Sequence, residues 1–250
     1  MNLIEEATKI LNEAENRNII VRVMGAIAFR LHSPNFSWIH EKFNREISDV
    51  DFVTYSKYSA EVTKLLEEFG YRMERALAVY ETKRRIFYPN NRKYVVDVFL
   101  DELNMCHKIN FKHRLEVDYP TIPLAELLLE KLQIIEFTKK DFIDVIMLLR
   151  EHEVANNDSE AINREVITNL LSDDWGFYYT ATNNLKKLKG FLVEHCDISG
   201  VLSDSDIKNI DEKIGFILKA IDEAPKTMKW KMRAKIGDRK KWYQEVESKR

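Results

Sequence analysis

The sequence predicts an α/β protein in which a mixed sheet flanked by helices is followed by a mostly helical C-terminal domain. Strand patterns alternate with helical patterns up to about residue 100, and from Pro123 onward the apolar residues keep mainly the helical period. The chain has 250 residues, of which 45% are hydrophobic. It can therefore fill the core of one large domain or of two modest ones.

The first predicted elements are a helix, a strand and a second helix. Residues 2–17 place apolar side chains on one helical face, namely Leu3, Ala7, Ile10, Leu11 and Ala14. The apolar run 19–24 is typical of a buried strand. Gly25 breaks this run, and residues 26–31 are expected to form the next helix.

More strands and one helix are expected in the same half. The pattern predicts a strand over 50–53 and a helix over 60–69, which Ser59 caps and Gly70 ends. Other strands are expected at 71–74, 78–88, 94–100 and 114–117, with a hairpin turn at residues 89–91.

Residues 123–150 are expected to form a helical hairpin. Pro123 suits a first helical turn, the apolar stripe covers 124–137, and Thr138 is expected to cap the second helix, 141–150.

Antiparallel packing of this hairpin would bring Lys131 near Asp141 or Asp144. Two interpretations stay open from the residues alone. The three residues form either a solvated ion pair of little energetic value or a functional cluster.

Three carboxylates stand out in the strand-rich half. Asp49 and Asp51 lie two positions apart, so in a strand they point to the same face, while Val50 and Phe52 point to the other. Asp97 lies within an apolar run, where burial is costly without a partner. Carboxylates this close repel one another unless a cation lies between them, and their oxygens suit Mg²⁺ or Mn²⁺. The alternative is an ordinary strand end or loop, because Asp-x-Asp is common by chance.

The order of these residues resembles the nucleotidyltransferase superfamily, which includes DNA polymerase beta and the aminoglycoside nucleotidyltransferases. The stronger resemblance is to the abortive-infection type nucleotidyltransferase toxins and their uncharacterised relatives. The matching segments, over residues 19–150, are Gly25 to Ala28, Arg45 to Asp51, Asp97, Lys131-Leu132 and Lys140 to Asp144.

The resemblance implies a nucleotidyltransferase-type sheet and a metal-dependent enzyme. Such an enzyme moves a nucleoside monophosphate from a nucleoside triphosphate to a hydroxyl acceptor, with RNA as one candidate acceptor and an antitoxin protein as a candidate partner. The implied catalytic residues are Asp49, Asp51, Asp97 and Lys131, and the implied ligands of Mg²⁺ or Mn²⁺ are Asp49, Asp51 and Asp97. The implied nucleotide-binding residues are Gly25, Ala26, Arg45, Lys131, Asp141 and Asp144. The catalytic domain would be residues 1–120, followed by a helical domain, 121–225, and a basic segment, 226–250.

Two positions depart from the family pattern. Ala26 stands where Gly or Ser is usual, which removes a hydroxyl that could bind a nucleotide phosphate, and Ile47 stands where Thr is usual, so a second small polar group is missing beside the expected metal site. A binding module without turnover is therefore one alternative. A small-molecule acceptor, as in antibiotic-modifying relatives, is the other.

Cations in two segments are candidates for binding phosphate. Lys83, Arg84 and Arg85 alternate along a strand, so one or two of them face the same side as the aspartates, unless they only protect an edge strand. The segment 226–250 has ten Lys and Arg against three acidic residues, a net +7, with Trp230, Trp242 and Tyr243 interleaved. It suits RNA, or a helix that docks its tryptophans on the helical domain.

The remaining composition favours a cytoplasmic protein. The formal net charge is -2. No apolar run approaches the ~20 residues that span a bilayer, and the first residues lack the pattern of a signal peptide. Cys106 and Cys196 define neither a disulfide framework nor a zinc site, and no pair among the six histidines has the spacing of metal ligands.

Overall fold

The computed structural model describes residues 2–75, 82–194 and 200–246. The chain forms two compact units. Unit 1 comprises the residues up to 32, 46–104 and 108–123, and unit 2 comprises 33–45, 105–107 and the residues from 124 onward. Unit 1 contains a mixed sheet and unit 2 is mostly helical, so the predicted fold class is confirmed.

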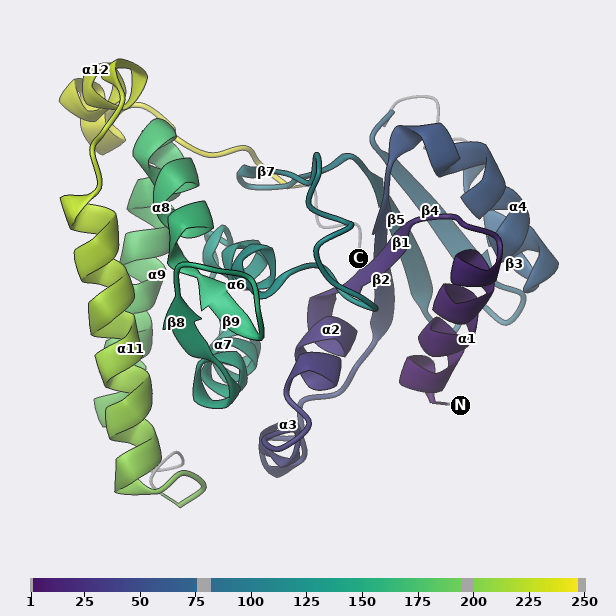
Figure 1. Cartoon of the computed structure of the whole chain (residues 1–250), viewed down its shortest axis with the longest axis horizontal. Coiled ribbons are helices and arrows are strands. Elements are labelled where there is room, and N and C mark those ends of the chain that lie inside the picture. Colours follow the sequence, from purple (N-terminus) through teal and green to yellow (C-terminus); the bar gives the residue numbers. More distant parts are fainter. Residues whose placement is uncertain (1, 76–81, 195–199, 247–250) are drawn as a thin grey trace. The chain divides into compact units, whose positions relative to one another are not determined.

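Unit 1 is built on a five-stranded sheet (Figure 1). In spatial order its strands are β1 (Val21–Met24), β2 (Asp49–Thr54), β5 (Val95–Leu100), β4 (Arg84–Pro89) and β3 (Tyr71–Met73). The central strands β2 and β5 run parallel, and all other neighbours in this sheet are antiparallel. Residues 78–81 of the strand predicted over 78–88 lie outside the described residues.

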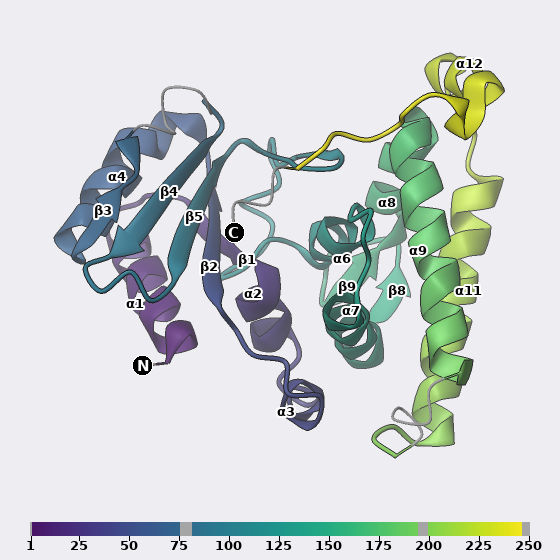
Figure 2. The same cartoon turned by 180° about the vertical axis from the view of Figure 1, so that it is seen from behind.

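Helices cover both faces of this sheet (Figure 2). α1 (Leu3–Asn16) and α4 (Ser59–Glu68) lie side by side on one face, and α2 (Gly25–His32) lies on the other. A short 3-10 helix, η1 (Ser56–Tyr58), precedes α4. α1 buries most of the apolar stripe that the sequence predicts, with Ala7, Ile10, Leu11 and Ala14 at most 1% exposed. The core of the unit includes the fully buried rings of Phe29, Phe52 and Phe87.

The segment after β5 contains a small hairpin and then an irregular stretch. Its strands are β6 (Glu102–Asn104) and β7 (Lys108–Asn110). The strand predicted over 114–117 is wrong, because this stretch forms turns. Within this stretch the Val117 N–H donates to the Arg114 carbonyl at 3.3 Å, which is the local bond of a turn.

Unit 2 consists mainly of helices. They are α3 (Trp38–Lys42), α6 (Leu124–Leu132), α7 (Lys139–Glu151), α8 (Arg164–Asp173), α9 (Trp175–Glu194), α11 (Asp204–Glu223), α12 (Met228–Ile236) and the 3-10 helix η2 (Gly237–Arg239). A short parallel pair interrupts them, β8 (Glu153–Ala155) and β9 (Ala161–Asn163). α9 and α11 lie side by side, with Ile210, Ile214, Ile217 and Ile221 of α11 at most 1% exposed. None of the helices in the described ranges is long and apolar enough to cross a membrane.

The predicted hairpin over 123–150 is present as α6 and α7, although α6 ends five residues before the predicted 137. Asn184 of α9 explains this early end. Its side-chain amide donates to the carbonyls of Leu132 and Ile134, at 3.1 and 2.7 Å, and so satisfies backbone groups where α6 stops. At the start of α7, the Asp141 carboxylate accepts hydrogen bonds from the N–H and the hydroxyl of Thr138, the predicted cap.

Candidate active site

Three carboxylates come together on the central strands of unit 1. Asp51 of β2 is the direct register partner of Asp97 of β5, and Asp49 is opposite Val95. Register partners on neighbouring strands point to the same face of a sheet. Asp49, Asp51 and Asp97 therefore share one face, while Val50 and Phe52 are buried on the other. Asp49 is exposed, Asp51 is half-buried and Asp97 is 8% exposed.

Gly25 lies against this cluster, at the point where β1 ends and α2 begins. β1 is antiparallel to β2, and its last residue, Met24, is the register partner of Asp51. Gly25 has φ +67°, and a Cβ built on it would lie 2.4 Å from Asp51 Oδ2. Only glycine leaves room for the Asp51 carboxylate here and adopts this conformation without strain. Ala26 follows inside α2 and is 5% exposed.

Arg84 of β4 binds Asp97. Its Nε donates to Oδ1 at 2.9 Å and its Nη2 to Oδ2 at 2.8 Å, which is the parallel two-bond geometry of a strong arginine–carboxylate pair. The sequence identifies Lys83, Arg84 and Arg85 as candidate cations but does not determine which of them faces the aspartates. Arg84 does so, because it stands two residues from Ile86, the register partner of Asp97.

The donor set suits a hard divalent cation, since it consists of carboxylate oxygens on one sheet face. Within the described ranges, no group of three or more His, Cys, Asp or Glu side chains has the arrangement of a metal site. Both oxygens of Asp97 are engaged by Arg84 in this conformation. The chemistry of these oxygens suits a divalent cation, but their arrangement in this conformation is not that of a metal site.

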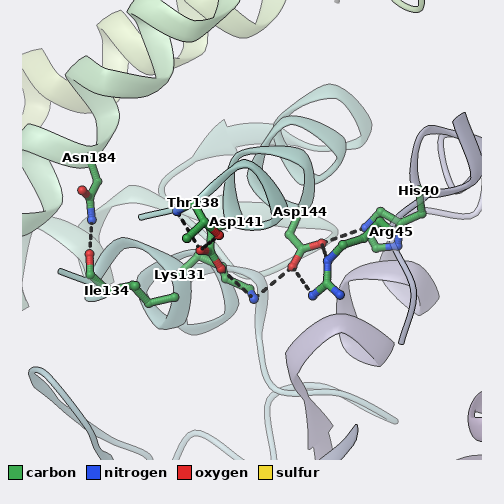
Figure 3. Close-up of polar contacts among 8 residues, drawn as sticks. All are labelled: His40, Arg45, Lys131, Ile134, Thr138, Asp141, Asp144 and Asn184. Atoms are coloured by element: carbon green, nitrogen blue, oxygen red, sulfur yellow. Dashed lines mark hydrogen bonds and ion pairs between the residues drawn. The ribbon is translucent and has the colours of Figure 1, made fainter. Parts of the chain in front are cut away.

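A second charged cluster lies in unit 2 (Figure 3). Lys131 Nζ of α6 contacts Asp144 Oδ2 of α7 at 2.9 Å and Asp141 Oδ1 at 3.4 Å. Asp144 is fully buried and Lys131 is 8% exposed. The proximity predicted across the hairpin is confirmed, and the interpretation as a solvated ion pair is wrong, because both partners are withdrawn from water.

His40 and Arg45, from an earlier part of the chain, complete this cluster. Arg45 Nε and Nη2 donate to the two oxygens of Asp144, each at 3.1 Å, and His40 Nε2 lies 2.9 Å from Asp144 Oδ1. His40 lies in α3, and the turn after this helix places Arg45, whose N–H donates to the His40 carbonyl at 2.7 Å. Arg45 belongs to the sequence motif, whereas no sequence pattern identifies His40 as a functional residue. Sequence reasoning treats His40 as one of six scattered histidines.

The charges of the cluster stabilise one another. Burial alone would raise the pKa of Asp144, but Lys131, His40 and Arg45 hold it well below its ordinary value. Burial alone would lower the pKa of Lys131, but Asp144 and Asp141 raise it above its ordinary value. Lys131 and Asp144 are therefore both charged at neutral pH.

The basic C-terminal segment packs its tryptophans on α9. The Trp242 indole N–H donates to Thr180 Oγ1 at 3.0 Å. The Trp230 ring lies 5.0 Å from the ring of Tyr178, centroid to centroid. A Cβ on Gly176 would lie 2.4 Å from the Trp242 carbonyl oxygen, so the backbone itself is in close contact with the helix. The sequence allowed two alternatives for this segment, RNA binding or docking of its tryptophans on the helical domain. The structure shows the docking, in which both Trp230 and Trp242 pack on α9.

Other side chains of the segment are exposed, among them Lys231, Lys235 and Lys240. An interaction of these lysines with a polyanion would be electrostatic and would involve little stacking. Cys196 lies outside the described residues, and Cys106 is a free thiol.

Comparisons with known proteins give only weak structural likeness. No protein family model matches the chain, and no curated protein matches it. Among solved structures, that of the antibiotic-resistance factor ANT(2'')-Ia is similar, with a TM-score of 0.37 and 10% sequence identity. The match covers 58% of this chain and 82% of that chain. Similarity at this level does not indicate a function for this chain.

Proposed function

We propose that this protein is a divalent-metal-dependent nucleotidyltransferase, which moves a nucleoside monophosphate from a nucleoside triphosphate to a hydroxyl acceptor. One observation carries the proposal. Asp49, Asp51 and Asp97 share a sheet face, and the missing side chain of Gly25 leaves room for the Asp51 carboxylate. Carboxylates concentrated in this way stay charged together at low cost only when cations neutralise them.

In this proposal Asp49 and Asp51 hold Mg²⁺ or Mn²⁺, and Asp97 completes the set. When bound, the cation would stabilise negative charge on the triphosphate as a Lewis acid. The acceptor oxygen forms a bond to the α-phosphorus while the bond from that phosphorus to the leaving oxygen breaks. The hydroxyl proton passes to Asp97, and pyrophosphate leaves.

The resemblance assigns Arg45, Lys131, Asp141 and Asp144 to nucleotide binding, with Lys131 offsetting charge on the leaving pyrophosphate. These roles remain part of the proposal. In unit 2 itself the four residues already balance one another, since two cations contact two carboxylates. A phosphate that binds Lys131 would therefore have to compete with Asp144.

We propose RNA as the first acceptor to test, because the exposed lysines of the C-terminal segment suit a phosphate backbone. A small-molecule hydroxyl is the alternative acceptor. The resemblance also implies a neutralising protein partner, and that partner stays a prediction.

Label transfer tests the proposal. The full chain is incubated with each of four nucleoside triphosphates labelled at the α-phosphate, with Mg²⁺ or Mn²⁺, and with pools of RNA, protein and small molecules. Asp49→Asn with Asp51→Asn should abolish transfer while leaving the thermal unfolding of the protein cooperative. The matched control is Glu61→Gln with Glu67→Gln, which removes two exposed carboxylates from α4 of the same unit.

The distribution of the label separates the alternatives. If label is transferred to RNA and this transfer disappears when residues 226–250 are removed, the segment binds the RNA acceptor. Transfer to small molecules supports the antibiotic-type alternative. Binding of Mn²⁺ and triphosphate without any transfer would leave a binding module. Transfer that survives in the double Asp variant would refute the assignment of the site.

A further inference from the structure

One side of α12 exposes a row of apolar side chains. Met228, Met232 and Ile236, the outer stripe, follow one another at intervals of four residues, so they lie on the same side of the helix. Their exposed fractions are 70%, 60% and 42%. Single exposed apolar residues are ordinary, whereas neighbouring ones mark a surface that another molecule covers.

The opposite side of α12 is already packed on α9, at one end of that helix (Figures 1 and 2). The Trp230 ring contacts the Tyr178 ring, and the Arg233 guanidinium carbon lies 4.7 Å from the centroid of the Trp175 ring. Trp230 and Met232 are two positions apart, which is roughly 200° around a helix. The packing of α12 on α9 therefore leaves the outer stripe exposed.

Lysines flank the outer stripe on both sides. Lys231 and Lys235 lie on one side of it and Lys229 on the other, and α12 contains no acidic residue. Lys229 pairs with Asp173 at 3.0 Å, but both side chains are more than half exposed, so this pair is worth little. Within the described ranges, Lys231 and Lys235 make no ion pair. The surface is an apolar row between positively charged edges.

This pattern suits an acidic amphipathic helix better than RNA or lipid. A helix with an apolar stripe between carboxylates matches it in both chemistry and charge, as in the paired helices of a coiled coil. Methionine side chains adapt readily to such a partner. A phosphate backbone would use the lysines but not the outer stripe, and the Trp230 ring, which could stack on a base, is packed on Tyr178. Helices that bind at a membrane surface carry Trp, Phe or Leu on their apolar side, and the outer stripe has none of these.

We propose that the outer stripe and its flanking lysines bind an acidic amphipathic helix of a partner protein. The apolar side chains of that helix pack against Met228, Met232 and Ile236, and its carboxylates face Lys231 and Lys235. The proposal concerns a surface of unit 2 and does not depend on the transferase activity proposed for the aspartates of unit 1. Either proposal can fail without the other.

A synthetic peptide is the probe for this surface. It is about 18 residues long, because shorter isolated helices are marginal in water, and it carries leucines along one helical side with glutamates on both flanks. The control peptide has the same composition, with the leucines distributed around the helix. Fluorescence anisotropy of the labelled peptides measures binding to the full chain at physiological salt. The striped peptide should bind at least about tenfold more tightly than the control peptide.

Met228→Gln with Met232→Gln removes most of the outer stripe without changing the charge, and glutamine is a good helix former at exposed positions. This variant should bind the striped peptide at least about tenfold more weakly and should keep its affinity for tRNA within about twofold. Met232→Gln alone replaces it if the double variant does not fold. The matched control is Val193→Gln, which removes an apolar side chain of α9 that is 83% exposed and should change neither affinity.

The lysines are tested separately. Lys231→Gln with Lys235→Gln should weaken binding of the striped peptide and flatten its dependence on salt, because fewer charge pairs form across the interface. The matched control is Lys186→Gln with Lys187→Gln, which removes the same charge from exposed positions of α9 and should leave the affinity within about twofold.

Three results would overturn the proposal. The first is equal binding of the two peptides, or an unchanged peptide affinity of the methionine variant. The second is a loss of tRNA affinity in the methionine variant as large as its loss of peptide affinity, which would assign the surface to RNA. The third is binding to phosphatidylglycerol vesicles that is lost in the methionine variant while the striped peptide does not bind, which would assign the surface to lipid.

Discussion

Replacing Lys131 by Met should strongly destabilise unit 2. Methionine keeps the length and most of the aliphatic volume of the side chain, so the change mainly removes the ammonium group. Asp144, which is fully buried, then loses its contact at 2.9 Å, and Asp141 loses its contact at 3.4 Å. Breaking a buried ion pair from one side leaves a buried charge with less compensation.

The expected loss is about 3 kcal/mol of unfolding free energy. Breaking a buried pair costs ~3–5 kcal/mol, and the low end applies because Arg45 and His40 still contact Asp144. For a chain of this size, that loss corresponds to a fall of roughly 6–12 °C in the melting temperature. The full effect is expected at pH 7. The contribution of Asp144 is lost only as pH falls toward its lowered pKa, and that of Lys131 only as pH rises toward its raised pKa.

Lys189→Met is the matched control. Lys189 pairs with Asp211 at 2.9 Å in the same unit, but the side chains are 37% and 42% exposed, so removing the ammonium group should cost ~1 kcal/mol or less. Urea unfolding followed by tryptophan fluorescence measures both variants, because all four tryptophans belong to unit 2. Equal losses for the two variants would refute the reasoning from burial. Triphosphate affinity of the folded Lys131 variant, measured alongside, tests the role that the resemblance implies.

Two further predictions concern Gly25 and His107. Gly25→Ala should cost about 1–2 kcal/mol because φ +67° is unfavourable for alanine. It should also weaken Mn²⁺ binding, since its Cβ would displace the Asp51 carboxylate. Gly190→Ala in α9 is the control, because no atom lies within 4 Å of the new Cβ, so its unfolding free energy should be unchanged or higher. Calorimetry measures the stability of both variants, and similar losses of unfolding free energy would count against the close approach at Gly25. The second prediction is that unit 2 loses stability in mild acid, because burial lowers the pKa of His107 to about 4. Between the ordinary value of about 6.5 and this value, the unfolded chain binds a proton that the folded chain does not. Unfolding free energy should therefore fall by about 2 kcal/mol from pH 7.5 to pH 5 relative to His107→Gln, as measured by urea unfolding, and parallel pH profiles of the two proteins would contradict it.

Local sequence patterns were sufficient to predict several structural features of this protein. The stripe Ala7, Ile10, Leu11 and Ala14 predicted the buried face of α1, and the spacing of Asp49 and Asp51 predicted that they share a face of β2. The cap Thr138 predicted where α7 begins. Each of these features depends on residues a few positions apart, whose geometry follows from the period of a helix or a strand.

The early end of α6 could not be predicted in this way. The apolar stripe continues to residue 137, but Asn184 of α9 binds the carbonyls where the helix stops. The turns at 114–117 are another such case, because local propensity favours a strand there. A side chain 50 residues away in sequence, or a backbone bond within a turn, overrides a weak local preference.

The sequence by itself determined which chemical groups this protein brings to a site: paired carboxylates, a glycine before a helix, and a lysine facing acids across a hairpin. Only the tertiary structure decided how they are partnered. The parallel register of β2 and β5 sets Asp97 beside Asp51, the phase of β4 selects Arg84 over Arg85, and packing of α3 on α7 brings His40 and Arg45 to Asp144. Register, strand phase and burial arise from contacts between distant segments, so no local period encodes them.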